Sequence, residues 1–351
     1  MSSLPQTQAV YRIAEFTGPE GVKRFEEDVP TKLNKNEVLV KIKAVALNYR
    51  DVSVSNNAFI TYTKKNVIPC SDGSGEVVAV GEDVQRFQVG DRIITNFDPT
   101  DMYGNAKFLD GNSLGSIVDG VLCQYRVFSQ ETINKVPKDS HLSHEEAATL
   151  VGTGVTVWNS LYGSGKPFVA GQTVLMLGTG GVSITALSLA KAAGAITIIT
   201  SSSDEKLKYA KEEYGADYVI NYNKTPDWEK EVLKFTNGEG VDFVFETGGN
   251  GTIEKSILST KVGGQVCLIG FLGQTKEFPD VVSSILTKSI SVRGIYVGSR
   301  QLAEQLIQFV HAKKVHVPVG KVFGSSQEEV LAAYNNVKSQ KQIGKTVIKV
   351  D

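Results

Sequence analysis

A glycine-rich turn between an apolar strand and a helix is the segment of this sequence best suited to chemistry. Val174–Leu177 reads as a buried strand, and the residues after it are Gly178, Thr179, Gly180, Gly181, Val182 and Ser183. Glycines let the backbone approach a ligand closely, and a helix N-terminus attracts anions, so this turn is suited to a pyrophosphate. Its strand–turn–helix context makes it a specific dinucleotide signal, although Ser183 replaces the usual third glycine. A tight turn without a ligand is the alternative.

The end of the next strand bears on which dinucleotide would bind. Ile196–Thr200 is followed by Ser201, Ser202 and Ser203, and Lys206 lies about one helical turn further on. An NAD site favours a carboxylate here, whereas small hydroxyls and a cation leave room for a 2′-phosphate. Asp204 and Glu205 argue against this, but acids are also favourable in a first helical turn. We therefore predict NADP(H) as the cofactor in preference to NAD(H).

The elements around this turn alternate between strands and helices from about residue 154. Further strands are predicted at 196–200, 218–220, 241–245 and 265–269, with a helix capped by Ser202 or Ser203 and ended by Gly215, and another starting at Thr225-Pro226. Such alternation requires a parallel sheet covered on both faces. The fold class is therefore α/β, with a doubly wound Rossmann-type domain.

The first third is β-rich instead, with apolar runs at 38–45, 77–80 and 92–94 separated by glycine turns, which favours a barrel or sandwich. Asn96–Gly120 reads as a long functional loop. Ser143 and Glu146 form a predicted capping box, and His141 and His144 beside it do not have the spacing of a metal site. Helices near 301–311 and 327–338 and a strand at 346–350 are predicted to rejoin the first domain.

The composition of the sequence excludes several classes of function. The 351 residues carry 37 Lys+Arg and 38 Asp+Glu, a formal charge of −1 without a basic cluster, so nucleic acid is an unsuitable partner. Cys70, Cys123 and Cys267 stand apart, which favours a reducing compartment. There is neither a signal-peptide pattern nor an apolar run long enough to cross a membrane. We predict a soluble cytoplasmic enzyme without a membrane partner.

Several segments together resemble the medium-chain dehydrogenases/reductases over essentially the whole chain. They are the turn 178–183, Leu47-Asn48-Tyr49-Arg50-Asp51, Asp72-Gly73-Ser74-Gly75-Glu76, Gly90-Asp91-Arg92, Thr153-Gly154-Val155-Thr156 and Gly344-Lys345-Thr346. The chain is most similar to the zinc-less quinone oxidoreductase-like branch, often labelled zinc-type alcohol dehydrogenase-like. The resemblance implies a β-rich GroES-like catalytic domain, residues 1–153 with 300–351, around a Rossmann domain, residues 154–299. It also implies a homodimer.

The sequence departs from the zinc-containing branch of that family at each ligand position. Asn48 stands where those enzymes have a catalytic cysteine, and Cys70-Ser71-Asp72 replaces their Gly-His-Glu motif. The third ligand position falls near Val151–Gly152, and Cys123 is the one cysteine in the region of their four-cysteine lobe. Zinc prefers three or four thiolate, imidazole or carboxylate ligands, so we predict that no metal is bound.

The resemblance also implies cofactor contacts outside the glycine turn. Lys206 and Tyr222 match residues around the 2′-phosphate and adenine ribose, and Thr156 matches a threonine near the nicotinamide. The segments Gly270-Phe271 and Ile295–Val297 match backbone that lines the nicotinamide ring. Tyr222 at a sheet edge and Thr156 within a helix also have purely structural interpretations.

Without a Lewis acid, hydride transfer is easiest onto an already polarised acceptor, such as a quinone, an enone or an activated carbonyl. Hydrogen-bond donors must then stabilise the developing oxyanion, and the candidates are Asn48, Tyr49, Arg50 and Ser71. A metal-free alcohol/aldehyde oxidoreductase with the same cofactor is one alternative. A non-catalytic nucleotide-binding sensor or structural protein is another.

Overall fold

The structure is a computed structural model that describes residues 4–58, 62–104, 112–273 and 279–351. The chain divides into two compact units. Unit 1 comprises residues 1–155 and 298–351, and unit 2 comprises residues 156–297. The boundaries predicted from the sequence lie at 153 and 300. Part of the predicted loop 96–120, residues 105–111, lies outside the described residues.

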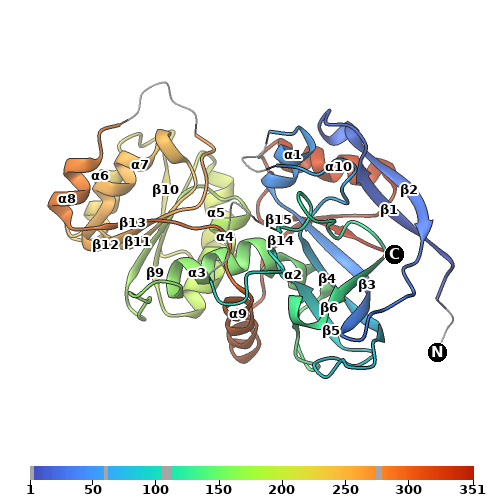
Figure 1. Cartoon of the computed structure of the whole chain (residues 1–351). Helices are drawn as coiled ribbons and strands as arrows, with labels where there is room; N and C mark the ends of the chain where they lie inside the picture. The colour runs from blue at the N-terminus through green and yellow to red at the C-terminus, as the bar shows by residue number, and fades with distance from the viewer. Residues whose placement is uncertain (1–3, 59–61, 105–111, 274–278) are drawn as a thin grey trace. The chain divides into compact units, whose positions relative to one another are not determined.

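Unit 2 contains a six-stranded parallel sheet with the strand order β10-β9-β8-β11-β12-β13. Helices α4 and α5 pack against each other and against one side of the sheet (Figure 1). Helices α6 and α7 likewise pack against each other and against strands of the sheet. This is the predicted doubly wound α/β domain. Its elements are α3 (Val155–Tyr162, which begins at the last residue of unit 1), β8 (Thr173–Met176), α4 (Gly181–Ala192), β9 (Ile196–Ser201), α5 (Asp204–Tyr214), β10 (Tyr218–Asn221), α6 (Trp228–Phe235), β11 (Val241–Glu246), α7 (Ile253–Ser259), β12 (Thr260–Leu268), α8 (Val282–Lys288) and β13 (Ser291–Gly294).

Local chemistry fixes the helix ends in unit 2. Ser203 caps α5 by accepting from the Lys206 amide, and Gly215 ends that helix in the left-handed conformation, with φ +67°. Both ends agree with the sequence prediction. The prediction for the next helix was wrong, because α6 begins at Trp228 after Asp227 rather than at Pro226. A turn in which the Thr225 amide donates to the Asn221 carbonyl delays the helix.

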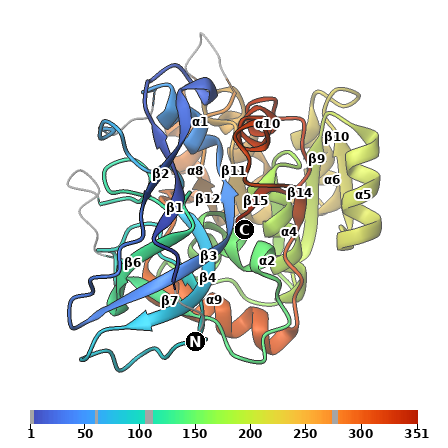
Figure 2. The ribbon, with the colours of Figure 1, turned by 90° about the vertical axis from the view of Figure 1, so that its right-hand side faces the viewer.

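Unit 1 is the predicted β-rich domain. Seven strands form one sheet in the order β14-β15-β3-β4-β5-β7, with β6 also paired to β3, and β1 and β2 form a separate antiparallel pair (Figure 2). The elements are β1 (Thr7–Ile13), β2 (Val22–Asp28), β3 (Glu37–Leu47), α1 (Tyr49–Ser55), β4 (Asp72–Val80), β5 (Arg92–Thr95), β6 (Tyr125–Ser129), β7 (Ile133–Lys135), α2 (His144–Thr149), a π-helical turn (Leu150–Gly154), α9 (Arg300–Lys313), β14 (Val319–Phe323), α10 (Gln327–Lys338) and β15 (Lys345–Lys349). The predicted capping box of α2 is present, since Ser143 Oγ accepts from the Glu146 amide and Glu146 accepts from the Ser143 amide.

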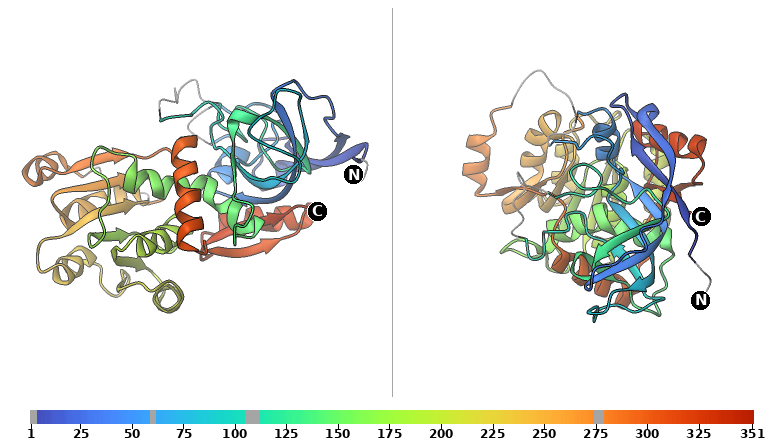
Figure 3. Two further views of the ribbon diagram at one scale, coloured as in Figure 1. Left: turned by 90° about the horizontal axis from the view of Figure 1, so that it is seen from below. Right: turned by 45° about the vertical axis from the view of Figure 1, so that its right-hand side comes forward.

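The C-terminal segment returns to unit 1, as predicted. β15 pairs antiparallel with β3, and β14 pairs parallel with β15 on its other side, so the red and blue ends of the chain lie together in this unit (Figure 3). The register sets Thr346 opposite Leu47 and Ile348 opposite Val45. Across this pairing, residues almost 300 positions apart in the sequence become neighbours.

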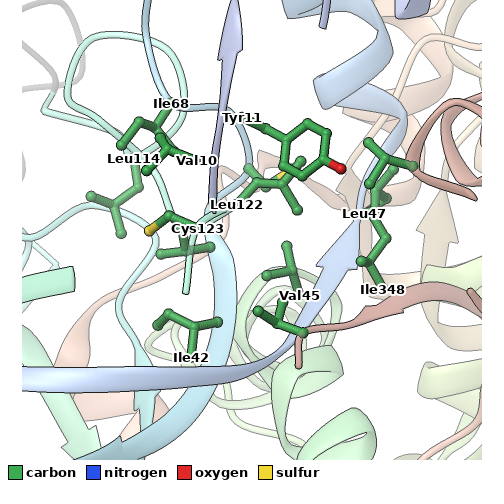
Figure 4. Packing of buried hydrophobic residues seen from close by; sticks show 14 of the residues in the cluster. Val10, Tyr11, Ile42, Val45, Leu47, Ile68, Leu114, Leu122, Cys123 and Ile348 are labelled. Atoms are coloured by element: carbon green, nitrogen blue, oxygen red, sulfur yellow. The ribbon is translucent and has the colours of Figure 1, made fainter. Parts of the chain in front are cut away.

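The core of unit 1 fills the space between the strands and the C-terminal helix. Ile42, Val45, Leu47, Leu122 and Ile348 pack together there and are almost wholly buried (Figure 4). Burying side chains of this kind contributes roughly 1.5–3 kcal/mol each, which holds the sheet and the C-terminal segment in one body. In the part of the chain that the structure describes, no helix is long and apolar enough to cross a membrane.

Candidate active site

The glycine turn of unit 2 has the geometry of a ligand cradle. Gly178 has φ +76°, a conformation that favours glycine, and its amide lies 3.2 Å from Thr200 Oγ1. A Cβ atom built on Gly178 or on Gly180 would meet no heavy atom within 4 Å. The turn is therefore open above its backbone, at the N-terminus of α4. We call residues 178–183 together with Thr200–Ser203 the nucleotide cradle.

The side-chain hydroxyls of Ser183, Thr179 and Ser201 make hydrogen bonds within this cradle. Ser183, in place of the third glycine of the usual pattern, is buried, and its Oγ donates to the Leu177 carbonyl at 2.7 Å. That bond satisfies the hydroxyl, so the serine fits between strand and helix. Thr179 Oγ1 and Ser201 Oγ lie 3.2 Å apart, and Ser201 is buried, whereas Ser202 is exposed. Gly181 and Val182 form the first turn of α4.

Two charged side chains beyond the end of β9, those of Asp204 and Lys206, have different surroundings. Asp204 accepts from Asn221 Nδ2 at 2.7 Å and from Lys224 Nζ at 2.5 Å, and the hydrogen bond from Lys224 lowers the pKa of this carboxyl. Lys206 is half-buried, and burial lowers its pKa. Tyr222 follows β10 with 39% of its surface exposed. The nearby acid is thus already paired with a lysine, while no described residue forms an ion pair with Lys206 within 4 Å.

A buried glutamate organises the loop after β11, and the sequence analysis did not single it out. Glu246 Oε1 accepts from the amides of Gly248 and Gly249 at 2.7 and 2.9 Å and from Thr252 Oγ1 at 2.6 Å. Gly249 in turn lies so close to Phe271 that a Cβ on it would come within 2.8 Å of the Phe271 Cα. Glu246 therefore fixes the backbone against which Gly270 and Phe271 lie. In the sequence, the feature that could have indicated this role is the position of Glu246 directly after the predicted strand 241–245.

Three of the remaining residues predicted to contact the cofactor, Thr156, Ile295 and Val297, lie near the first and last residues of unit 2. The Ile295 amide donates to the Leu268 carbonyl at 2.8 Å, and Asn159 Nδ2 donates to the Val297 carbonyl at 2.8 Å. Val297 has φ +51°, which is strained for a β-branched residue. Thr156 is buried in α3, where its carbonyl accepts from Ser160 Oγ. Asn159 thus holds a strained segment that the resemblance associates with the nicotinamide.

Unit 1 brings the polar segments 48–51 and 71–72 together. Asn48 precedes α1, and its amide donates to Asp51 Oδ2 at 2.7 Å. Asp51 is fully buried, and burial raises its pKa to about 6, although Arg50 at 3.7 Å opposes that shift. Asp51 therefore orients the start of α1.

A buried ammonium group lies at the centre of these segments. Lys345 is 3% exposed, and its Nζ donates to the Leu47 carbonyl at 2.7 Å and to Asn48 Oδ1 at 2.5 Å, with Asp72 Oδ2 3.6 Å away. Asp72 also accepts from Ser71 Oγ at 2.7 Å and from the Gly152 amide at 2.9 Å. We call Asn48, Asp72, Gly152 and Lys345 the ammonium cluster.

The three other predicted donors, Tyr49, Arg50 and Ser71, differ in their surroundings. Arg50 packs over the Phe97 ring and donates to the Leu114 carbonyl, Ser113 Oγ and Ser116 Oγ at 2.7–3.0 Å. It therefore ties α1 to both ends of the predicted loop 96–120. Tyr49 is 42% exposed at the first position of α1. Ser71 is buried and already donates to Asp72.

Three members of the ammonium cluster, Asn48, Asp72 and Gly152, lie in the segments that the resemblance matches to the catalytic ligands of the zinc branch, so they allow a test of whether zinc would fit. Asp72 alone among its members offers a side chain that zinc prefers, and Asn48 Oδ1 accepts from a cation already. Gly152 has no side chain that could ligate a metal, and its amide already donates to Asp72 Oδ2. Among the described residues, no group of three or more His, Cys, Asp or Glu could hold a metal ion. The donor set does not fit zinc.

Comparison with known proteins agrees with this architecture. Family models described as "Alcohol dehydrogenase GroES-like domain" and "Zinc-binding dehydrogenase" match residues 34–138 and 181–312. A zinc-type alcohol dehydrogenase-like protein of Schizosaccharomyces pombe is 42% identical over 96% of this chain and 97% of its own length. A quinone oxidoreductase of Pongo abelii is 26% identical over 93% of this chain and 92% of its own. The crystal structure of a putative alcohol dehydrogenase from Sinorhizobium meliloti matches with a TM-score of 0.89 and 32% identity, covering 99% of this chain and all of that one.

The chain therefore belongs to the medium-chain dehydrogenase/reductase superfamily. Members of this superfamily are oxidoreductases that bind a nicotinamide dinucleotide and act on small molecules. Unit 1 is the GroES-like domain and unit 2 the Rossmann domain.

Proposed function

We propose that this protein is an NADPH-dependent reductase of quinones, enones or other activated carbonyls and that it works without zinc. The observation that carries the proposal is the ammonium cluster, in which the buried Lys345 donates to Asn48, the residue that the resemblance sets at a ligand position of the zinc branch. A site that offers hydrogen-bond donors rather than a Lewis acid suits acceptors whose carbonyl is already polarised.

The preference for NADPH rests on the charges beside the nucleotide cradle. Ser201 and Ser203 leave room at the end of β9, Lys206 supplies a cation, and Asp204 is already paired with Lys224. A 2′-phosphate is stabilised by a nearby lysine and repelled by an unpaired carboxylate. Lys206 and Tyr222 would therefore hold the phosphate and the adenine ribose.

The backbone of the cradle fits a dinucleotide because the space above Gly178 and Gly180 is open. The amides at the start of α4 would bind the pyrophosphate there. Gly270, Phe271, Ile295, Val297 and Thr156 would border the nicotinamide. When bound, the cofactor supplies the hydride.

The residues of unit 1 would bind and polarise the acceptor. Asn48 and Tyr49 retain donors with access to solvent, so they are the best candidates to hydrogen-bond the oxygen that gains charge. Ser71 and Arg50 already donate to neighbouring groups and would position those donors. Such a preorganised donor accelerates a reaction by roughly 10²–10³-fold.

The test is a substrate panel of quinones, enones, aldehydes and secondary alcohols, followed by NADPH absorbance in chelator-treated buffer. Turnover of quinones or enones without alcohol oxidation is the expected result. Oxidation of plain secondary alcohols would favour the metal-free alcohol/aldehyde oxidoreductase. Tight NADPH binding without any turnover would favour a non-catalytic nucleotide-binding protein.

We also propose a homodimer, in line with the family resemblance. In the described part of unit 2, β13 is the last strand in the sheet order and lies next to β12 alone, so its outer edge is available to a second copy. Sedimentation velocity at several concentrations tests this, and a monomer at every concentration would contradict it.

A further inference from the structure

Lys345 and Asn48 meet because of the strand register in unit 1. β15 runs antiparallel to β3 with Thr346 opposite Leu47, so the next pair in the register is Lys345 opposite Asn48. Lys345 therefore lies at the end of β3, where the chain turns into α1. The resemblance in the sequence included Gly344-Lys345-Thr346 but attached no role to the lysine.

The ammonium group is held entirely by protein atoms of unit 1. Its two hydrogen bonds go to the Leu47 carbonyl and to Asn48 Oδ1, and Asp72 is its ionic partner. Burial lowers the pKa of Lys345, and the nearby Asp72 opposes that shift. A buried charge destabilises a fold unless it is compensated, so a lysine kept at this position needs a reason beyond packing.

The lysine determines which way the Asn48 amide faces. An ammonium group has three donors and no acceptor, so the amide atom beside it must be the oxygen. Asn48 Nδ2 then points away from Lys345 with both of its hydrogens. No described residue accepts a hydrogen bond from Nδ2, which lies beside Gly152, a residue without a side chain, and Asn48 is half-buried. The arrangement leaves one oriented donor at the surface of the ammonium cluster.

We propose that Lys345 is a positioning residue that fixes the Asn48 amide so that Nδ2 donates to the oxygen of the acceptor. This inference rests on the proposed function. Hydride adds to the acceptor carbon, the former π electron pair moves to the acceptor oxygen, and a proton from solvent completes the reduction. The ammonium draws electron density from Oδ1, which strengthens the hydrogen bond that Nδ2 donates. Lys345 does not touch the acceptor in this scheme.

A double-mutant cycle separates this role from a structural one. Asn48→Ala is expected to lower kcat by about 100-fold, because it removes an oxyanion donor. Lys345→Met is expected to lower kcat by about tenfold, with the KM of the acceptor and the Kd of NADPH unchanged within about twofold. The double variant is expected to be no slower than Asn48→Ala, since Lys345 acts through Asn48. Lys349→Met is the matched control, an exposed lysine on the same strand that should retain full activity.

Two further measurements test the same role, and the first of them does not require that Lys345→Met folds. Asn48→Asp keeps a partner for the ammonium but lacks the amide donor, so it should fold and lose kcat as Asn48→Ala does. In the NMR spectrum, the side-chain amide signals of Asn48, assigned by their loss in Asn48→Ala, should move on Lys345→Met and remain in place on Lys349→Met.

If the two losses of kcat multiply in the double variant, the inference is overturned while the proposed function stands. The same holds if Asn48→Asp keeps a normal kcat. A Lys345→Met enzyme that loses only NADPH affinity would also overturn it, because the lysine would then be a cofactor contact. A wild-type protein inactive toward the whole acceptor panel would overturn both proposals.

Discussion

In unit 2, the polar site is built from backbone: glycines with open space above them, a helix N-terminus, and hydroxyls that bond to the nearest strand. In unit 1, it is built from the side chains of Asn48, Asp72 and Lys345, which come from three separate segments, with the amide of Gly152 from a fourth. The first kind of site depends on local conformation, and the second depends on long-range pairing and on charge compensation. Space-filling substitutions should therefore damage unit 2, whereas changes of charge should damage unit 1.

The largest effect is expected from filling the nucleotide cradle. Gly180→Val adds its side chain to open space, and the backbone at this position is already extended, so the fold should lose at most about 1 kcal/mol. NADPH affinity should fall roughly a thousandfold, about 4 kcal/mol, by isothermal titration calorimetry. Gly165→Val is the control, because its Cβ also meets open space but lies outside the cradle. Unchanged affinity in Gly180→Val would show that the dinucleotide does not use this turn.

Removing the buried carboxyl of Asp51 should change the pH dependence of stability. Its pKa in the folded protein is raised from 3.8 to about 6, so between these values the folded state binds more protons than the unfolded state. Wild-type stability should therefore fall as pH rises through this window. Relative to wild type, the free energy of unfolding of Asp51→Asn should rise by about 2 kcal/mol from pH 4 to pH 7. Urea unfolding at four pH values measures this, and parallel curves for the two proteins would contradict it.

A smaller effect is expected from the cation beside the cradle. Lys206→Ala should weaken NADPH binding about tenfold and leave NADH binding unchanged, because only the phosphorylated cofactor interacts with this charge. Lys208→Ala, on the same helix, is the matched control, since that lysine pairs with Glu212. Equal losses for the two cofactors would assign Lys206 to something other than the 2′-phosphate.

The smallest effect concerns the helix that leads into the π-helical turn at Gly152. Ser143→Ala removes the hydroxyl that caps α2 and should lower the free energy of unfolding by about 1 kcal/mol. NADPH affinity should not change, because the cap lies in unit 1, outside the nucleotide cradle. Thermal unfolding with and without NADPH tests both statements, and a loss of affinity alone would contradict them.

Local patterns explain which parts of the molecule the sequence could predict. The capping box at Ser143, the serine cap and glycine end of α5, and the strand–turn–helix junction at Gly178 depend on residues close together in the chain. The start of α6 was predicted wrongly at Pro226, because a hydrogen-bonded turn before it competes with the helix.

The ammonium cluster shows why the rest could not be predicted. The departures at Asn48 and Asp72 were visible in the sequence, but the group that compensates them is Lys345, 297 residues further along. Its role follows from the antiparallel register of β15 with β3, which no local pattern specifies. Glu246 was missed for a similar reason, since its partners, Gly249 and Thr252 in the following loop and Ser256 in α7, become apparent only once the loop is folded.

The most direct test of the account measures metal content and activity on the same chelator-treated sample. Elemental analysis should find far less than one zinc per chain, while NADPH-dependent reduction of a quinone or enone proceeds at the untreated rate. Loss of activity on chelation, restored by stoichiometric zinc, would contradict the proposal that the enzyme works without zinc.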